Sequence, residues 1–210
     1  MKKYFFLIVA AMAFMMTNCK PDDPVDPTVD PSGDDPLTEV RAPQVVSKVV
    51  VNPNGFNTLF VQLHNPNNAA IDFTFDVEFI KNGQVVGNAN GLYYNALPKN
   101  EDCMTWSNWG IPANPDEIRI VNLNFNRSVY QVVKMDLVKE VESSAGYLTL
   151  GFRTPDAFNV EADVEVVFYK NNQIVSHSLW SFFPGDVLEY TFEILDDYDS
   201  YKVFARAYSM

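Results

Sequence analysis

The sequence predicts an all-β protein with two tandem antiparallel β-sandwich domains, and three observations support this prediction. The segment Phe60 to Val86 recurs 89 positions later as Thr149 to Val175, with seven identities in 27 ungapped columns. From residue 44 onward, apolar residues alternate with polar ones, as in strands that have one buried face. No segment after the first 18 residues shows a sustained helical period. A repeat of about 90 residues indicates two whole domains rather than a solenoid of short units.

The longest alternating strand is predicted at the centre of each repeat. In the first copy Ile71, Phe73, Phe75, Val77 and Phe79 alternate with Asp72, Thr74, Asp76 and Glu78. In the second copy Val160, Ala162, Val164, Val166 and Phe168 alternate with Glu161, Asp163 and Glu165. We expect the acidic stripes to be solvated sheet faces, since nothing in their spacing raises one carboxyl pKa over another.

Each central strand is followed by a turn signal, Asn82-Gly83 in the first copy and Asn171-Asn172 in the second. Both residues of such a turn need positive φ, so these dipeptides predict hairpins. Further strands are expected at about 44–51, 58–64, 84–90, 101–106 and 117–125, then at 129–139, 147–153, 173–180, 187–194 and 201–208. The predicted domains span 42–126 and 127–210.

The first 18 residues have the layout of a secretory signal peptide, with Lys2 and Lys3 before an apolar run from Tyr4 to Met16. This run is shorter than the roughly 20 apolar residues that a transmembrane helix needs. Cys19 follows directly, and Met16-Thr17-Asn18-Cys19 resembles the cleavage and lipidation signal of bacterial lipoproteins. The resemblance implies an outer membrane lipoprotein anchored through acylated Cys19.

Residues 19–41 form a predicted tether in which Pro alternates with Asp. Seven acidic residues and Lys20 give residues 20–40 a charge of −6, so this segment cannot bury a core and stays extended and disordered. The residues after Cys19, Lys-Pro-Asp-Asp, are similar to the signal of surface-exposed lipoproteins in Bacteroidetes-type bacteria. The similarity implies an outward-facing protein; the alternative is a lipoprotein that faces the periplasm.

The net charge of −12 argues against nucleic-acid binding, because an acidic surface repels phosphate backbones. Without Lys2 and Lys3 the charge becomes −14. Two histidines and two cysteines are too few for a zinc site or a disulfide framework. We expect no cofactor and no metal, His64 and His177 at the surface, and Cys103 as a buried thiol.

The two copies also resemble a known family of domains. Asn65-Pro66, the long alternating strand, Asn-Gly-Gln-Val-Val and Leu97-Pro98-Lys99 together look like the CARDB-type and fibronectin type III-like Ig-like domains of bacterial surface proteins. Phe183-Pro184-Gly185-Asp186 matches the proline-glycine-acid turn of that pattern in the second copy. The resemblance implies adhesion or binding without catalysis.

Aromatic residues are the candidate binding residues. Trp106 and Trp109 have no counterpart in the second copy and lie near a predicted loop, where aromatic side chains can stack on sugars or anchor a protein. The alternative is that they fill the junction between the domains. Tyr94 and Trp180 are further candidates for sugar stacking. Because Leu92-Tyr93 aligns with Leu179-Trp180, an aromatic residue at this place is expected to pack in the core.

Two functional hypotheses follow from the sequence. The first is a non-catalytic cell-surface lipoprotein that serves in adhesion or protein interaction, with loops and strand edges as its recognition surfaces. The second is a glycan-binding lipoprotein that captures polysaccharide at the outer membrane. An enzyme is not expected, because the sequence contains no phosphate-binding loop, nucleophile elbow or metal motif.

Overall fold

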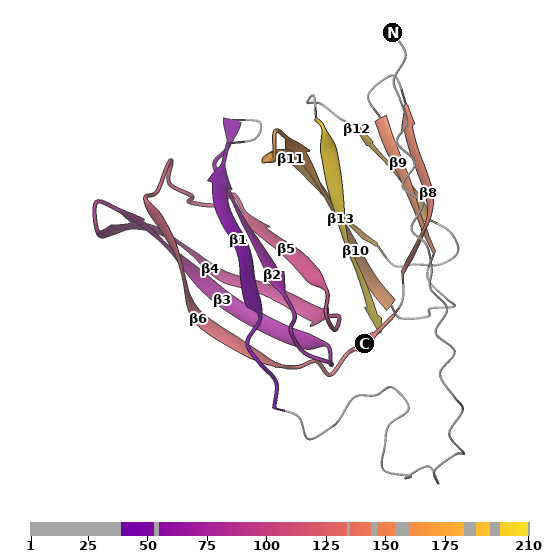
Figure 1. Ribbon diagram of the computed structural model, residues 1–210, viewed down its shortest axis with the longest axis horizontal. Helices are drawn as coiled ribbons and strands as arrows, with labels where there is room; N and C mark the ends of the chain where they lie inside the picture. The colour runs from indigo at the N-terminus through magenta and orange to yellow at the C-terminus, as the bar shows by residue number, and fades with distance from the viewer. Residues whose placement is uncertain are drawn as a thin grey trace, which may run out of the picture. The chain divides into compact units, whose positions relative to one another are not determined.

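The structure, a computed structural model, describes residues 39–52, 55–133, 135–143, 147–153, 160–182, 188–193 and 198–209. All described elements are β-strands and all strand pairs are antiparallel, which confirms the predicted all-β fold (Figure 1). Residues 36–210 form one compact unit. The signal peptide, Cys19, nearly all of the tether and the Phe183-Pro184-Gly185-Asp186 turn lie outside the described residues.

The first half of this unit contains two three-stranded sheets. The first inner sheet has the order β1-β2-β5, and the first outer sheet has the order β4-β3-β6. Their strands are β1 (Gln44–Val51), β2 (Thr58–His64), β3 (Ile71–Lys81), β4 (Gln84–Leu97), β5 (Asp102–Ser107) and β6 (Glu117–Arg127). The prediction for β4 was too short by seven residues, because its apolar pattern continues beyond a bulge.

The second half repeats this strand order. The second outer sheet is β12-β9-β8, and the second inner sheet is β11-β10-β13-β7. Its strands are β7 (Gln131–Val132), β8 (Asp136–Ser143), β9 (Tyr147–Arg153), β10 (Val160–Lys170), β11 (Gln173–Phe182), β12 (Leu188–Glu193) and β13 (Ser200–Ser209). The single strand predicted at 129–139 is instead two strands, since β7 pairs with the end of β13 and β8 pairs with β9.

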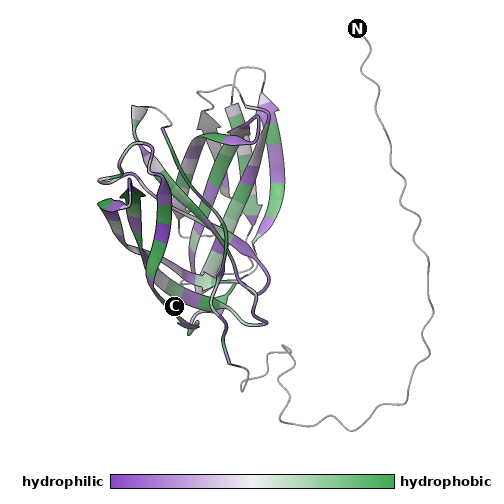
Figure 2. Cartoon of the chain, turned by 60° about the vertical axis from the view of Figure 1, so that its left-hand side comes forward, coloured by the Kyte–Doolittle hydropathy of each residue, from purple (hydrophilic) through white to green (hydrophobic). Residues whose placement is uncertain are grey.

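Each half has its own apolar core between its two sheets. The first core contains Leu59, Val61, Phe73, Phe75 and Phe79, all nearly inaccessible to solvent. The second core is built in the same way from β9 and β10. Figure 2 shows the hydrophobic and hydrophilic residues alternating along the strands, as one-sided burial requires. A third cluster joins the first inner sheet to the second inner sheet, so the four sheets are stacked in succession.

Both predicted hairpins are confirmed. Asn82 and Gly83 have φ of 52° and 75°, and Asn171 and Asn172 have φ of 49° and 63°. In each half, an aspartate in the loop before the last strand accepts a hydrogen bond from the first residue of the turn. Asp116 Oδ2 accepts from the Asn82 N–H at 2.7 Å, and Asp199 Oδ2 accepts from the Asn171 N–H at 2.6 Å. Asp116 and Asp199 therefore have the same structural role in the two halves.

A bulge in β4 changes the correspondence between the aromatic residues. Phe75 pairs with Leu92 and Val77 with Ala89, so Asn90 and Gly91 together lie opposite Asp76 and β4 has one extra residue, with Gly91 at φ 67°. In the second half Val164, the counterpart of Phe75, pairs with Trp180. Trp180 thus corresponds to Leu92 and not to Tyr93. The expectation that an aromatic residue here is core fails for Tyr93, which is 60% exposed.

The Asn65-Pro66 motif holds a buried corner of the first half. The Asn65 amide donates to the carbonyls of Ala69, Leu97 and Pro98 at 2.8, 3.0 and 3.0 Å. Its Oδ1 accepts from the backbone N–H of Asn67 at 3.0 Å. Asn65 is fully buried, so its amide satisfies carbonyl groups that water does not reach.

The substitution Asn65→Asp is expected to lower the free energy of unfolding by at least about 2 kcal/mol, because a carboxylate cannot donate to the three carbonyls. Urea unfolding followed by tryptophan fluorescence measures the change. Asn88→Asp on the exposed part of β4 is the matched control and should change stability by less than about 0.5 kcal/mol. Equal effects of both substitutions would contradict a structural role of the corner.

Candidate functional site

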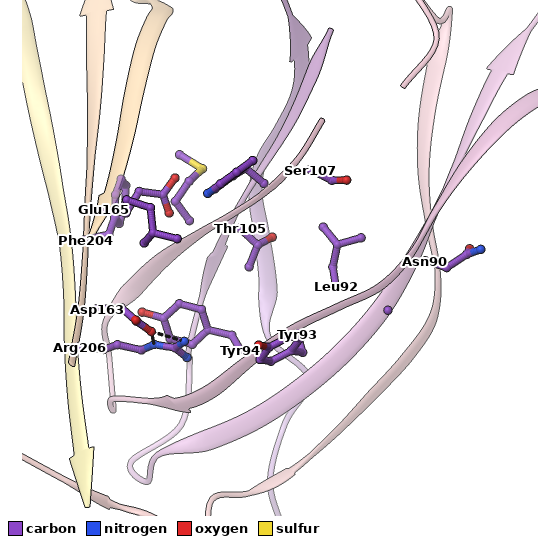
Figure 3. Close-up of a pocket in the computed structure, with 14 residues that line it drawn as sticks. Asn90, Leu92, Tyr93, Tyr94, Thr105, Ser107, Asp163, Glu165, Phe204 and Arg206 are labelled. Atoms are coloured by element: carbon purple, nitrogen blue, oxygen red, sulfur yellow. Dashed lines mark hydrogen bonds and ion pairs between the residues drawn. The ribbon is translucent and has the colours of Figure 1, made fainter. Parts of the chain in front are cut away.

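A cavity of about 340 Å³ lies where the two halves meet, and we call it the junction pocket (Figure 3). One wall comes from β4 and β5 of the first half, and the other comes from β10, β11 and β13 of the second half. Its lining residues include Tyr94, Thr105, Trp106, Glu165 and Arg206. Neither half could form this pocket alone.

The halves are joined beside the pocket by apolar contact between the outward faces of the two inner sheets. Phe60 and Met104 from the first half pack with Val167 and Phe204 from the second, and all four are buried. Trp106 is half-buried against this cluster. The interface is therefore built like a small core, with apolar residues where a free sandwich would have polar ones.

Arg206 on β13 connects the halves at the other side of the pocket. Its guanidinium pairs with Asp163 Oδ2 at 2.5 Å and donates to the Asn95 carbonyl at 2.9 Å. It also lies over the Tyr94 ring, 4.1 Å from the centroid. The hydrogen bond and the ring contact both reach the first half, so this single side chain ties β13 and β10 to β4.

Glu165 contradicts the expectation that the second acidic stripe is solvated. It is only 5% exposed, because the second inner sheet turns this face toward the first half. Its Oε1 has no hydrogen-bond partner and lies 3.9 Å from His177 Nδ1. Burial, reinforced by the nearby Asp163 carboxylate, raises the pKa of Glu165 to about 8. This carboxyl group is therefore mainly protonated at neutral pH.

His177 was expected at the surface, and the structure places it in the junction instead. Its ring centroid lies 4.5 Å from that of Trp106 and 4.9 Å from that of Phe60, both in edge-on geometry. Burial lowers the pKa of His177, and its Nδ1 has no hydrogen-bond partner. The neutral imidazole thus serves as part of the apolar interface.

The acidic stripe of the first half is partly exposed, as predicted. Asp76 accepts from the Gly91 N–H at 2.7 Å and from the Asn122 amide at 2.8 Å, which lowers the pKa of Asp76. His64 also lies near the surface, where Nδ1 is 2.8 Å from Asp102. These hydrogen bonds connect β3 to β4 and β6, and β2 to β5.

The four aromatic residues proposed for binding do not lie together in one site. Trp106 and Tyr94 line the junction pocket, but Tyr94 is buried between Arg206 and Phe73. Its ring has no free face for a sugar. Trp180 stacks on Tyr190 with centroids 4.7 Å apart, on the second half alone. Trp109 is 87% exposed in the loop between β5 and β6.

A second exposed aromatic residue lies in the loop before β2. Phe56, between β1 and β2, is 69% exposed. The two loops are joined because the Asn57 amide donates to the Ile111 carbonyl at 3.1 Å. We call the exposed side chains of Phe56 and Trp109 the aromatic tip. Large apolar side chains exposed on loops are a feature common at protein-binding sites.

Other candidate chemistry is limited in the part of the chain that the structure describes. Cys103 is a buried free thiol, as expected, and burial raises its pKa well above the usual range. No group of three metal-ligating side chains is found among the described residues. The same residues include no helix long and apolar enough to span a membrane.

A comparison of the two copies does contain evidence for the junction, although the alternation of apolar and polar residues alone does not reveal it. Val167 stands where the first copy has Glu78, and Arg206, opposite Asp163, stands where the first copy has Asn124 opposite Thr74. Apolar and basic residues on a predicted polar face indicate that another surface covers it. This comparison identifies the buried face, but not the surface that covers it.

Comparison with known proteins adds no assignment, because no protein-family model and no curated protein matches this chain. The candidate functions below therefore depend on the residues alone.

The raised pKa of Glu165 makes stability depend on pH. Between about pH 4.5, the ordinary pKa of a glutamate, and about 8 the native Glu165 keeps a proton that the unfolded chain has released, so the free energy of unfolding falls as pH rises through this range. The slope is at most roughly 1.4 kcal/mol per pH unit. Below about pH 6.5 the lowered pKa of His177 opposes this decline, so the decline is clearest between about 6.5 and 8.

We expect Glu165→Gln to remove this decline, and Glu78→Gln, on the exposed stripe, to leave it unchanged. Urea unfolding at several pH values between about 6.5 and 8 measures both. Parallel stability curves for wild type and Glu165→Gln would show that Glu165 is ionised in the native protein.

Proposed function

We propose that this chain is a non-catalytic, lipid-anchored cell-surface protein that binds a protein partner through its aromatic tip. The exposed indole of Trp109 is the observation that supports this function best. An exposed tryptophan is disfavoured in water, and tryptophan is enriched among the residues that dominate binding energy at protein interfaces. The hydrogen bond from the Asn57 amide to the Ile111 carbonyl restrains this loop, which lowers the entropy lost on binding.

The signal peptide and Cys19 support the proposed location at the membrane. A single acyl chain gives marginal membrane binding, so a lipoprotein anchor depends on the full modification of its N-terminal cysteine. The acidic tether of residues 19–41 would carry the folded unit away from the lipid surface. The aromatic tip could then reach a partner outside the outer membrane; a periplasm-facing protein is the alternative.

A second candidate function is glycan capture, which the same indole supports. A fully exposed indole face can stack on a sugar ring as well as enter a protein pocket. The four aromatic candidates do not form one extended platform, since Tyr94 is buried and Trp180 lies elsewhere. This separation favours the protein partner over a long polysaccharide.

Nothing in the described pocket supports catalysis. Glu165 has a raised pKa, but the neighbouring Asp163 is paired with Arg206, and His177 is part of the apolar interface. No hydroxyl or thiol is hydrogen-bonded to a base there among the described residues. We therefore propose binding without a reaction.

Cys19→Ala is expected to abolish incorporation of labelled palmitate and to move the protein from the membrane fraction to the soluble fraction. Cys103→Ala is the matched control and should keep both label and location, because Cys103 is a buried thiol. Protease added to intact cells should degrade a surface-exposed protein. Protection that ends only on lysis would instead show a periplasmic orientation.

Trp109→Ala is expected to weaken adhesion of cells that display the full-length protein by at least about tenfold, as for a central interface tryptophan. Phe56→Ala should have a smaller effect of the same sign, and Tyr147→Ala, exposed on the second half, should have none. A saturable change of tryptophan fluorescence with purified polysaccharides, lost in Trp109→Ala, would favour glycan capture. Wild-type adhesion by Trp109→Ala would refute a role for the aromatic tip.

A further inference from the structure

The junction pocket contains one more acidic group than its basic group can pair. Asp163, Glu165 and Arg206 are its charged lining residues. Arg206 is already engaged by Asp163 and by the Asn95 carbonyl. Glu165 is left with an unpartnered Oε1, although it is almost completely buried. Groups of this kind are rare in native proteins and mark strain or a missing partner.

The nearest group does not supply that partner. His177 Nδ1 lies 3.9 Å from Glu165 Oε1, which is beyond hydrogen-bond distance. Its imidazole is held by edge-on contacts to Phe60 and Trp106. Neither atom has a hydrogen-bond partner among the described residues, and Glu165 lines the pocket, so a group bound there lies beside its carboxyl group. Figure 3 shows Glu165 at the pocket wall formed by the second half, opposite Thr105 from the first half.

We propose that the junction pocket binds a small organic ammonium ion, with Glu165 as the carboxylate that pairs with the ammonium group. The ammonium supplies the positive charge that the pocket lacks, and a charge-assisted hydrogen bond is stronger than a neutral one. An anion is excluded because it would meet two acidic groups while Arg206 is engaged. A neutral ligand would leave Glu165 protonated and could not form the charge-assisted hydrogen bond that an ammonium group forms.

The volume and the lining residues of the pocket narrow the class of ammonium ligand further. A cavity of about 340 Å³ is near the small end of ligand pockets, which begin at roughly 300 Å³, so it suits a ligand with one ring. Trp106 lines the cavity, and indole is the aromatic group that attracts cations best. Leu92, Leu179 and Phe204 provide apolar contact for the carbon skeleton. An amino sugar or a cyclic amine meets these requirements.

Binding is coupled to a proton. In the free protein Glu165 is mainly protonated at neutral pH, so pairing with an ammonium ion releases one proton to solvent and leaves a carboxylate. The titratable and charged groups near Glu165 are Asp163 and Tyr169 on the same strand, His177 on β11 and Arg206 on β13, with Tyr94 on β4 and Cys103 on β5. This site is separate from the aromatic tip, so either can fail without the other.

Isothermal titration calorimetry of the detergent-solubilised full-length protein tests the proposal with two matched pairs: glucosamine against glucose, and cyclohexylamine against cyclohexanol. We expect each amine to bind at least about tenfold more tightly than its neutral partner. Titration in buffers of different ionisation enthalpy should show proton release. Glu165→Gln should lose the preference and the proton release, while Glu78→Gln, outside the pocket, should keep both.

Three results would overturn the proposal. Equal affinity for the amine and its neutral partner would identify a pocket for uncharged rings. An unchanged preference in Glu165→Gln would remove this residue from the site. Absence of saturable heat with both amines would show that the pocket takes no cation of this size. Because Gln has the shape of Glu and carries no unpaired charge, Glu165→Gln is expected to fold, and its unfolding curve verifies this.

Discussion

The structure depends on apolar contact between the outward faces of the two inner sheets. A β-sandwich needs one buried face in each sheet, yet here both inner sheets are covered on both sides. Phe60, Met104 and Trp106 lie on the outward face of the first inner sheet. The second outer sheet, their counterpart by repeat, carries Thr149, Glu189 and Thr191 at these positions and is exposed to water. Burial at the junction therefore makes the two halves chemically different.

This contact also creates the unusual electrostatics of the junction pocket. β10 keeps the alternation of its repeat, so acidic residues remain on a face that is now buried. Asp163 is compensated by Arg206 at 2.5 Å, and Glu165 is not compensated. Burial of an unpaired carboxylate costs several kcal/mol, and protonation at neutral pH avoids most of that cost. The cavity and the raised pKa of Glu165 thus have the same origin.

Patterns among neighbouring residues were enough to predict the strands and hairpins. Packing between strands that are distant in the sequence determined the residues of the junction pocket. The alternation at Phe73, Phe75 and Val77 and the Asn82-Gly83 turn depend on neighbouring residues, so strands and hairpins followed from the sequence. The burial of Glu165 and His177 depends on the first inner sheet, which is distant from them in the sequence. The β4 bulge also shifted the alignment by one residue, which assigned Tyr93 to the core in place of Leu92. A period of two cannot reveal an inserted residue.

The repeat helps to separate structural from functional residues once register is known. Asp116 and Asp199 hold equivalent hairpins in the two halves, so their carboxylates belong to the fold. Trp109 and Arg206 occur in one half only, since the first half has Asn124 at the position of Arg206. The junction pocket has walls from both halves, and hence its ligand would contact residues that neither copy holds alone. A ligand bound there would link the halves further, because the contacts that it adds exist only while β4 and β5 face β10 and β13.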